Sequence, residues 1–387
     1  MPEADVRPQH AAASLDDEWR RWHDQRYPAQ LLHLDTAAAG RCSTGTLRAA
    51  AEHAEREAAR GAYVAEAEVA PVLEAGRAGL ARLLGVPPAG LAFVESGSAA
   101  LQALLTAWPL QPGDTVAVLP SEWGPNLAAF GYRGLRLIEL AAGDDGAVDL
   151  DRLERFLAAT PPAFVHLTHV TSHRPLVQPV AEVAALCRDA GVPLWVDAAQ
   201  ALGHVDTACG ADVLYATSRK WMTGPRGVGL LAVSERWWET LRVRTSPMDV
   251  PDAAAVRRLE SHEANVPGRI GLCTAVREFV DAGPEQVWLR LAEVGTLTRQ
   301  ALHDLPGWAV VEAGGASSAI TALRATAGQD IRAACARLVA AHGIVTTAGA
   351  TWRAPRDMTE PLLRISPHVD CTADDLGVLR SALQAVS

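Results

Sequence analysis

Short apolar runs that favour strand alternate with amphipathic stretches through the middle of the chain. The apolar runs occupy residues 91–96, 115–121, 163–170, 193–200, 213–218 and 228–234. Strands that alternate with helices in this way usually build a largely parallel sheet. The pattern therefore predicts an α/β layer over this part of the chain.

The stretches between and after these runs predict helices. Residues 179–191 begin with Pro179 and end with Gly191, the usual order at the two ends of a helix. A second helix is expected to open at Ser98. The remaining expected elements are a helix over 15–25, a helix over 285–302, strands within 308–313, 318–325, 344–349 and 362–369, and a last helix that begins at residue 372 with capping-box spacing.

The length of 387 residues suits two domains. We expect a large domain over residues 31–269 and a smaller α+β domain formed by residues 1–30 and 270–387. The composition is that of an ordinary globular protein, with 49% hydrophobic and 21% charged residues.

Charge and cysteine content narrow the possible partners. The formal net charge is −10 and no long basic run occurs, which disfavours binding to nucleic acid. The N-terminal residues are polar where a secretory signal needs an apolar core, and no apolar run is long enough to span a bilayer. Six scattered cysteines without a CxxC pair indicate reduced thiols. We therefore expect a cytoplasmic protein with neither nucleic acid nor membrane as a partner.

Three polar features lie where the predicted strands end. Gly97 and Ser98 open a helix, where free amides favour an anion, although such a pair is often only a helix cap. Asp197 ends an apolar strand and needs donors or a cation, with a plain salt bridge as the alternative. Lys220 follows another strand and precedes a glycine-rich turn, a place where lysine is usually exposed. Because ligands of open α/β sheets bind at the carboxyl ends of the strands, the three features are expected to meet.

Together these features match the needs of pyridoxal phosphate. That cofactor requires a lysine for its aldehyde, a carboxylate for its ring nitrogen and a cup for its phosphate. At an effective dielectric constant near 20, a charge pair about 4 Å apart is worth roughly 4 kcal/mol. An interaction of that size would raise the pKa of the ring nitrogen by roughly three units.

Several motifs extend this match: HLDTAAAG at residues 33–40, SGS at 96–98, DAAQ at 197–200, and RISPHVDCT at 364–372. On these motifs the chain resembles the class V aminotransferase and cysteine desulfurase group of pyridoxal-phosphate enzymes. The resemblance implies the α/β fold of type I, with a mostly parallel central sheet in the large domain and a smaller α+β C-terminal domain. It also implies a small amino-acid substrate and a homodimer with shared active sites.

The same resemblance assigns roles to individual residues. It makes Lys220 the catalytic lysine that binds the cofactor covalently, and it implies no metal site. The residues that it assigns to the cofactor are Gly97, Ser98, Ala99, Trp123, Ser172, Asp197, Gln200, Ser218 and Arg219. The residues that it assigns to the substrate are Thr36, Ala37, His173 and Arg364, the last as a bidentate partner of the substrate carboxylate.

The chain departs from the usual pattern of that group at several positions. Trp123 stands where a histidine often stacks on the cofactor ring, and Arg219 replaces a histidine before the lysine. Ser172 takes the place of a ring-contacting asparagine. Asn265 and Val266 replace a Gly-Thr pair whose threonine reaches the phosphate of the partner subunit, so that contact is expected to be lost.

One further departure concerns the reaction. A cysteine desulfurase carries a nucleophilic thiol on the loop before the substrate-binding arginine, and here that loop, residues 346–355, contains Trp352 and no cysteine. The motifs SRKWMTGPRGVG, VHLTHVTSHR, GIVTTA and LRISPHVD are most similar to the carbon-sulfur lyases of ergothioneine biosynthesis. This resemblance implies β-elimination of hercynylcysteine sulfoxide, which yields ergothioneine by way of its sulfenate, together with pyruvate and ammonia.

Other interpretations remain open on the sequence alone. The chain could be a desulfurase, an aminotransferase or a kynureninase relative, or a binding protein that reuses the fold. His166 and His169 lie three apart on a predicted strand and face opposite sides, which disfavours a shared metal ion. Most of the eleven tryptophans are interpreted as packing residues, with Trp352 as a candidate contact for a trimethylammonium group.

Overall fold

A seven-stranded sheet organises the large domain in the computed structural model, which describes residues 16–243, 255–261, 263–311 and 317–386. In these ranges the strand order is β2-β8-β7-β6-β5-β3-β4. Only the pairs that involve β8 are antiparallel, so the other strands all run in one direction. The predicted mostly parallel sheet is confirmed. The strands are β2 (Leu91–Val94), β3 (Thr115–Val118), β4 (Arg136–Glu139), β5 (Phe164–Thr168), β6 (Leu194–Asp197), β7 (Val213–Thr217) and β8 (Gly229–Val233).

All six apolar runs lie in this sheet, whereas the sequence pattern misses β4. Its residues read RLIE, and none of them is fully buried. Because β4 lies at the end of the strand order, one of its edges has no neighbouring strand among the described residues. An edge strand of this kind does not need the continuous apolar sequence by which the inner strands were found.

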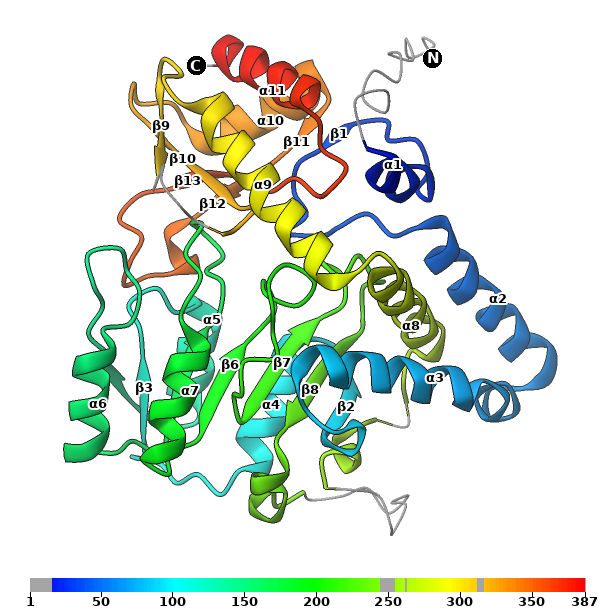
Figure 1. The fold of residues 1–387 in the computed structure, drawn as a ribbon, viewed down its shortest axis with the longest axis vertical. Helices are drawn as coiled ribbons and strands as arrows, with labels where there is room; N and C mark the ends of the chain where they lie inside the picture. The colour runs from blue at the N-terminus through cyan, green and yellow to red at the C-terminus, as the bar shows by residue number, and fades with distance from the viewer. Residues whose placement is uncertain (1–15, 244–254, 262, 312–316, 387) are drawn as a thin grey trace.

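Helices cover both faces of the sheet, as Figure 1 shows. Strand residues alternate between the two cores, with Val116 and Val118 on one side and Ala117 on the other. The first core includes α4 (Gly97–Ala107) and α5 (Gly124–Tyr132). The second includes α3 (Ala62–Leu84), α6 (Leu150–Ala159), α7 (Val180–Asp189) and α8 (Val266–Asp281), and α2 (Thr44–Arg60) packs on α3 and α8.

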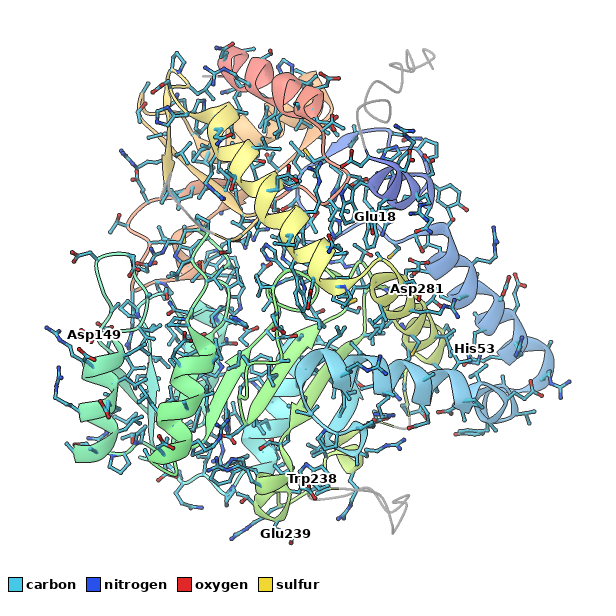
Figure 2. The ribbon with its side chains drawn as sticks, viewed as in Figure 1. Glu18, His53, Asp149, Trp238, Glu239 and Asp281 are labelled. Carbon is cyan, nitrogen blue, oxygen red and sulfur yellow. The ribbon has the colours of Figure 1, made fainter. Side chains whose placement is uncertain are left out.

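Local caps fix where several of these helices begin. Asp149 accepts a hydrogen bond from the Arg152 amide at the start of α6, and Figure 2 labels it there. Thr372 and Asp375 form the capping box that their spacing predicts, and it opens α11 (Ala373–Ala385). None of the described helices is long and apolar enough to cross a membrane.

The small domain is an antiparallel sheet with three helices. Its strand order is β12-β13-β10-β9, in the residues that the structure describes. The long helix α9 leads from the large domain to this sheet (Figure 1). The predicted strand over 344–349 is split into β11, which pairs with β1, and β12, which joins the sheet. The elements are β1 (Leu32–His33), α9 (Pro284–Leu302), β9 (Trp308–Val311), β10 (Thr321–Ala325), α10 (Ile331–His342), β11 (Ile344–Val345), β12 (Thr347–Gly349) and β13 (Leu362–Ile365); α1 (Asp17–Asp24) lies near the described N-terminus.

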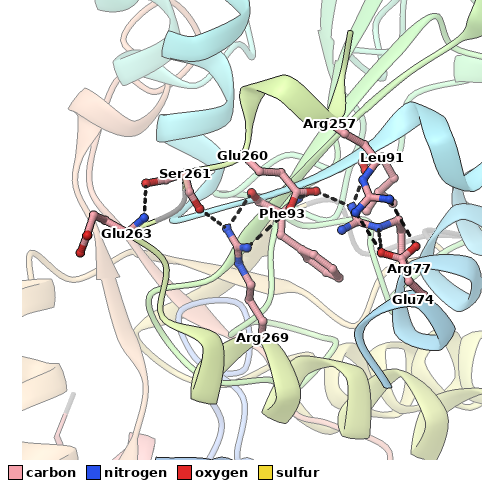
Figure 3. Close-up of polar contacts among 9 residues, drawn as sticks. All are labelled: Glu74, Arg77, Leu91, Phe93, Arg257, Glu260, Ser261, Glu263 and Arg269. Carbon is pink, nitrogen blue, oxygen red and sulfur yellow. Dashed lines mark hydrogen bonds and ion pairs between the residues drawn. The ribbon is translucent and has the colours of Figure 1, made fainter. Parts of the chain in front are cut away.

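The free edge of β2 is covered by side chains, as Figure 3 shows. Glu260 accepts a hydrogen bond from the Phe93 amide at 3.1 Å, and Arg77 donates to the Leu91 carbonyl at 2.6 Å. Arg269 donates to the Phe93 carbonyl at 3.2 Å, and both guanidinium groups pair with Glu260. These side chains satisfy backbone groups that would otherwise be open to pairing with another chain.

Replacement of Glu260 by glutamine is expected to destabilise the fold by about 3 kcal/mol, because it leaves two buried guanidinium groups without their shared anion. Urea unfolding followed by circular dichroism measures this loss. Glu263→Gln is the matched control, because it removes the same charge from a nearby side chain that is exposed. Equal effects of the two substitutions would show that the buried ion pairs do not stabilise this edge.

Candidate active site

Lys220 lies in the turn that follows β7, at the edge where the parallel strands end. The amide of Gly40 donates to the Arg219 carbonyl at 2.7 Å, and the Arg219 guanidinium donates to the Ala38 carbonyl. A Cβ on residue 40 would overlap the Lys220 carbonyl oxygen, so only glycine fits there. The segment before α2 is therefore held directly against the Lys220 turn.

Lys220 is the only lysine in the sequence, although the chain has 35 lysine and arginine residues in total. Burial lowers the pKa of Lys220 to about 7, opposed by the nearby Asp197 carboxylate and reinforced by Arg219 and Arg364. No hydrogen bond joins its amine to the described residues. An amine that is neutral near pH 7 is a competent nucleophile and proton acceptor.

Asp197 ends β6 beside β7, within electrostatic reach of Lys220. Its Oδ1 accepts a hydrogen bond from the Ala199 amide at 2.9 Å, and its Oδ2 accepts one from Asn126 Nδ2 at 3.0 Å. These two donors fix the carboxylate plane. The structure thus brings Lys220 and Asp197 to the same edge of the sheet, as their positions after successive strands predict.

A buried polar network lies behind Asp197, and most of its members were not expected. Asn126 Nδ2 also donates to Glu122 Oε1 at 2.9 Å, so one amide bridges two carboxylates. Glu122 Oε2 lies 2.9 Å from His166 Nδ1, and His166 Nε2 lies 2.9 Å from the Tyr215 hydroxyl. Glu122 could have been found from the sequence in the same way as Asp197, because each is a carboxylate at the end of an apolar run.

The network favours a charged Glu122. Burial opposes ionisation of Glu122, but His166 and the hydrogen bonds from Asn126 and Thr168 outweigh it and lower the pKa of the carboxyl group. Burial raises the pKa of Tyr215 well above its usual value, and the nearby Asp197 and Glu122 charges add to this effect. Tyr215 therefore stays protonated. His166, whose place on the strand disfavours a metal site shared with His169, bridges Glu122 and Tyr215.

The amides at the start of α4 form the candidate anion site. Ser96 caps the helix and accepts a hydrogen bond from the Ala99 amide at 3.1 Å, so this predicted contact is already used within the chain. The Gly97 and Ser98 amides have no acceptor among the described residues. Ser218, two residues before Lys220, is buried. Its hydroxyl donates to the Pro225 carbonyl, so this predicted cofactor contact is also used within the chain. Gly97 and Ser98 are thus left as the donors at this helix start.

Other predicted cofactor contacts surround this edge. Gln200 donates to the Ala37 carbonyl at 2.9 Å and accepts from Trp221 Nε1 at 2.9 Å, which leaves one of its amide hydrogens unused. The Ser172 hydroxyl is buried, and none of the residues that the structure describes forms a hydrogen bond with it. Trp123 is partly exposed just before α5 and lies edge-on to Trp352, with ring centroids 5.3 Å apart.

Arg364 is fully buried on β13. It donates to the Ser172 carbonyl at 2.9 Å and to Asp35 Oδ1 at 3.0 Å, while its Nε has no acceptor within the described part of the chain. Asp35 was not expected, and a bound carboxylate would share Arg364 with it. Thr36 and Ala37, which are also predicted to bind the substrate, are buried. Their amides donate to the carbonyl and the hydroxyl of Ser366, respectively.

His173 is tied to a loop of the small domain. Its Nε2 lies 2.6 Å from Asp357 Oδ2, and Arg174 Nε donates to the same carboxylate at 3.0 Å. The hydrogen bond from His173 is the main cause that lowers the pKa of Asp357, with burial opposing it and the Arg174 charge assisting. His173 therefore contacts the loop that carries Trp352 rather than open space. The Nδ1 atom of His173 is buried and has no hydrogen-bond partner in the described ranges.

The model of the family described as aminotransferase class-V matches residues 32–379. The chain belongs to this family. Among its relatives, a protein of Mycobacterium tuberculosis (strain CDC 1551 / Oshkosh) named a probable hercynylcysteine sulfoxide lyase is 48% identical over 97% of this chain and 95% of the relative. A cysteine desulfurase of Cronobacter sakazakii (strain ATCC BAA-894) is 27% identical over 65% of this chain and 67% of the relative.

Solved structures show that this class V chain has the fold expected from its motifs. A cysteine desulfurase from Escherichia coli superposes with a TM-score of 0.82 at 21% identity, covering 96% of this chain and 98% of that structure. The predicted architecture of a large domain with a mostly parallel sheet and a smaller α+β C-terminal domain is therefore confirmed.

Proposed function

We propose that the chain is a pyridoxal-phosphate-dependent carbon-sulfur lyase that cleaves hercynylcysteine sulfoxide by β-elimination. The observation that carries this proposal is the 48% identity, over 97% of the chain, to a relative named for that substrate. The products are the sulfenate of ergothioneine, pyruvate and ammonia. A thiol reductant outside the enzyme then supplies the two electrons that convert the sulfenate to ergothioneine.

The residues at the carboxyl edge of the sheet fit pyridoxal phosphate. Lys220 offers an amine whose pKa is lowered to about 7, Asp197 a fixed carboxylate for the ring nitrogen, and Gly97 and Ser98 free amides for the phosphate. The unpaired Ser172 hydroxyl gives a further buried donor. The bound cofactor supplies an electron sink for negative charge that develops at the substrate Cα.

The protein side of the reaction then consists of charge placement and one proton transfer. In this proposal Arg364 holds the α-carboxylate, and Trp123 is the residue that stacks on the cofactor ring. The Lys220 amine accepts the Cα proton, and its pKa of about 7 suits that role at neutral pH. The Cβ–S bond breaks with its electron pair leaving on sulfur, and water hydrolyses the remaining enamine to pyruvate and ammonia.

The environments of the cysteines argue against the desulfurase alternative. Burial raises the pKa of all six thiols, Cys42, Cys187, Cys209, Cys273, Cys335 and Cys371. A nucleophilic cysteine needs the opposite shift, toward thiolate. Together with Trp352 in the loop where a desulfurase carries its thiol, this favours elimination without an enzyme nucleophile.

Incubation of the cofactor-loaded protein with hercynylcysteine sulfoxide is expected to release pyruvate, measured by coupling to lactate dehydrogenase. Free cysteine is the matched alternative substrate. Release of alanine and sulfide from cysteine, with no pyruvate from the sulfoxide, would favour the desulfurase interpretation and overturn the proposal. An excess of external thiol controls for the fate of the sulfenate, because it changes that product and not the yield of pyruvate.

We also propose that the enzyme acts as a homodimer. Side chains on α2 and α3 support this, because Leu47, Tyr63, Val64 and Val72 are 42%, 71%, 49% and 44% exposed. Asn265 is exposed and Val266 buried at the start of α8. Of the two residues that replace the family's Gly-Thr pair, only Asn265 can therefore reach a partner subunit. The shared active sites and the cytoplasmic location stay predictions.

A further inference from the structure

Arg353 ends the short helix η5 (Thr351–Arg353), in the loop where desulfurases carry a thiol. Its guanidinium carbon lies 5.7 Å from the centroid of the Trp123 ring and 5.4 Å from that of Trp352. η5 packs on the start of α5, where a Cβ on Gly124 would overlap the Trp352 carbonyl. The arginine and both indoles therefore belong to one packed group, which we call the Arg353 cluster.

The charge of Arg353 has no partner among the described residues. Its Nε is buried without an acceptor, and no hydrogen bond or ion pair involves its guanidinium. Burial lowers the pKa of Arg353 to about 10, with Arg364 adding to the shift and Asp35 opposing it, so the group is a cation at neutral pH. A partly buried cation without an anion is costly, which indicates that a ligand supplies the anion.

Arg353 is not a duplicate of the arginine that binds the α-carboxylate. Arg364 already donates to Asp35 and Ser172, and it lies on a strand of the small domain. Arg353 lies close enough to Lys220 to lower the pKa of that amine. Arg353 also lies over the ring of Trp123, a residue assigned to the cofactor, so an anion on Arg353 can belong to the same bound molecule as the reacting centre, at a different point on it.

Trp352 adds a second recognition element beside this cation. Its side chain is 53% exposed, which is unusual for an indole, so part of the ring is open to solvent beside Arg353 and Trp123. The electron-rich face of an indole attracts ammonium groups, most of all quaternary ones that are weakly hydrated. A guanidinium 5.4 Å from the ring centroid thus places an anion-binding group next to a cation-binding one.

We propose that the Arg353 cluster binds a zwitterionic end of the substrate side chain, with the carboxylate on Arg353 and the quaternary ammonium on Trp352. This inference rests on the proposed function, because the hercynyl group carries a trimethylammonium and a carboxylate on one carbon. The cluster then determines specificity, since a cysteine derivative that lacks the zwitterion loses both contacts. The contacts that Arg353 and Trp352 make with this end of the substrate are separate from the proton transfer at Lys220.

Calorimetric titration of the cofactor-loaded protein with hercynine tests the site without turnover. We expect Arg353→Gln to weaken binding about 10- to 100-fold, the usual loss for a charged hydrogen-bond partner. Arg356→Gln is the matched control, because Arg356 lies on the same loop but pairs with Glu139 at the surface. Trp352→Leu is expected to weaken the binding of hercynine more than the binding of histidine, because the ammonium group of histidine is not methylated. Equal hercynine affinity in Arg353→Gln and the unchanged protein would overturn the proposal.

Kinetics separate this site from the reaction itself. S-methylcysteine sulfoxide has the same reacting atoms as hercynylcysteine sulfoxide but no zwitterion. We expect Arg353→Gln to lower the ratio of kcat/KM between hercynylcysteine sulfoxide and this analogue about 10- to 100-fold, chiefly through KM. An equal loss for both substrates would assign Arg353 to the reacting centre and overturn the proposal. If the unchanged protein binds hercynine through Arg353 but releases no pyruvate from its sulfoxide, the proposed function fails and the binding site stands.

Discussion

Replacement of Lys220 by alanine is expected to abolish pyruvate release, with turnover lowered by at least about 1000-fold. The variant has no lysine at all, because Lys220 is the only one in the sequence. No other ε-amine can therefore bind the cofactor or accept the Cα proton in its place. Borohydride reduction followed by peptide mass spectrometry is expected to find the cofactor on the peptide that contains Lys220.

The low pKa of Lys220 makes covalent loading of the cofactor dependent on pH. The attacking species is the neutral amine, so below its pKa of about 7 the loading rate is expected to fall about tenfold per pH unit. Above pH 8 the rate is expected to level off. Stopped-flow absorbance of the protein-bound cofactor measures this profile. A rate that keeps rising tenfold per unit up to pH 10 would show that the pKa of Lys220 is ordinary.

The lowered pKa of Lys220 also makes the free energy of unfolding depend on pH. The folded-state pKa lies below the unfolded value of 10.5, so between pH 7 and 10.5 the unfolded chain binds more protons. The cofactor-free protein should therefore gain stability as pH rises through this range. At pH 7 and below, Lys220→Met is expected to be more stable than the unchanged protein, and the difference should vanish above pH 10.5. Urea unfolding at both pH values measures it.

The sequence predicts the parts of this molecule that depend on continuous patterns. Buried strands of a parallel sheet are apolar along their length, and Lys220 and Asp197 follow such strands directly. The parallel order of β6 and β7 places the ends of these strands at one edge of the sheet. The two residues can therefore be expected to lie close together without knowledge of any contact between them. The capping box at Thr372 is equally local, so its two residues are visible from their spacing alone.

The residues that sequence reasoning misses act through contacts distant in the chain. Asp35 is explained only by its pairing with Arg364, 329 positions away. Asn126 gains its role from Asp197, 71 positions on, and His166 from Glu122 and Tyr215. Arg353 is distinguished by what it lacks, an acceptor for its guanidinium group. No local pattern of residue types carries such information.

Asn126 has the geometry of a positioning residue for Asp197. It holds the carboxylate through Oδ2 and is itself held by Glu122, whose charge is sustained by His166. The orientation of the carboxylate that we propose for the cofactor nitrogen is therefore set by Asn126 and, behind it, by Glu122 and His166. Loss of Asn126 should act through kcat, because the hydrogen bonds of Arg364, the proposed substrate-binding residue, go to Ser172 and Asp35 and not to Asn126.

Replacement of Asp197 by asparagine is expected to lower kcat for pyruvate release about 1000-fold, since an ion pair of roughly 4 kcal/mol no longer keeps the ring nitrogen protonated. Asn126→Ala should lower kcat about tenfold by removing one donor to a charged group, with KM unchanged.

Asp212→Asn is the matched control for both substitutions, because Asp212 is equally buried and accepts a hydrogen bond from the Leu194 amide at the opposite end of β6. It should lower the melting temperature and leave kcat unchanged. Equal losses of kcat in all three variants would mean that the sheet, and not the charge facing the cofactor, limits turnover.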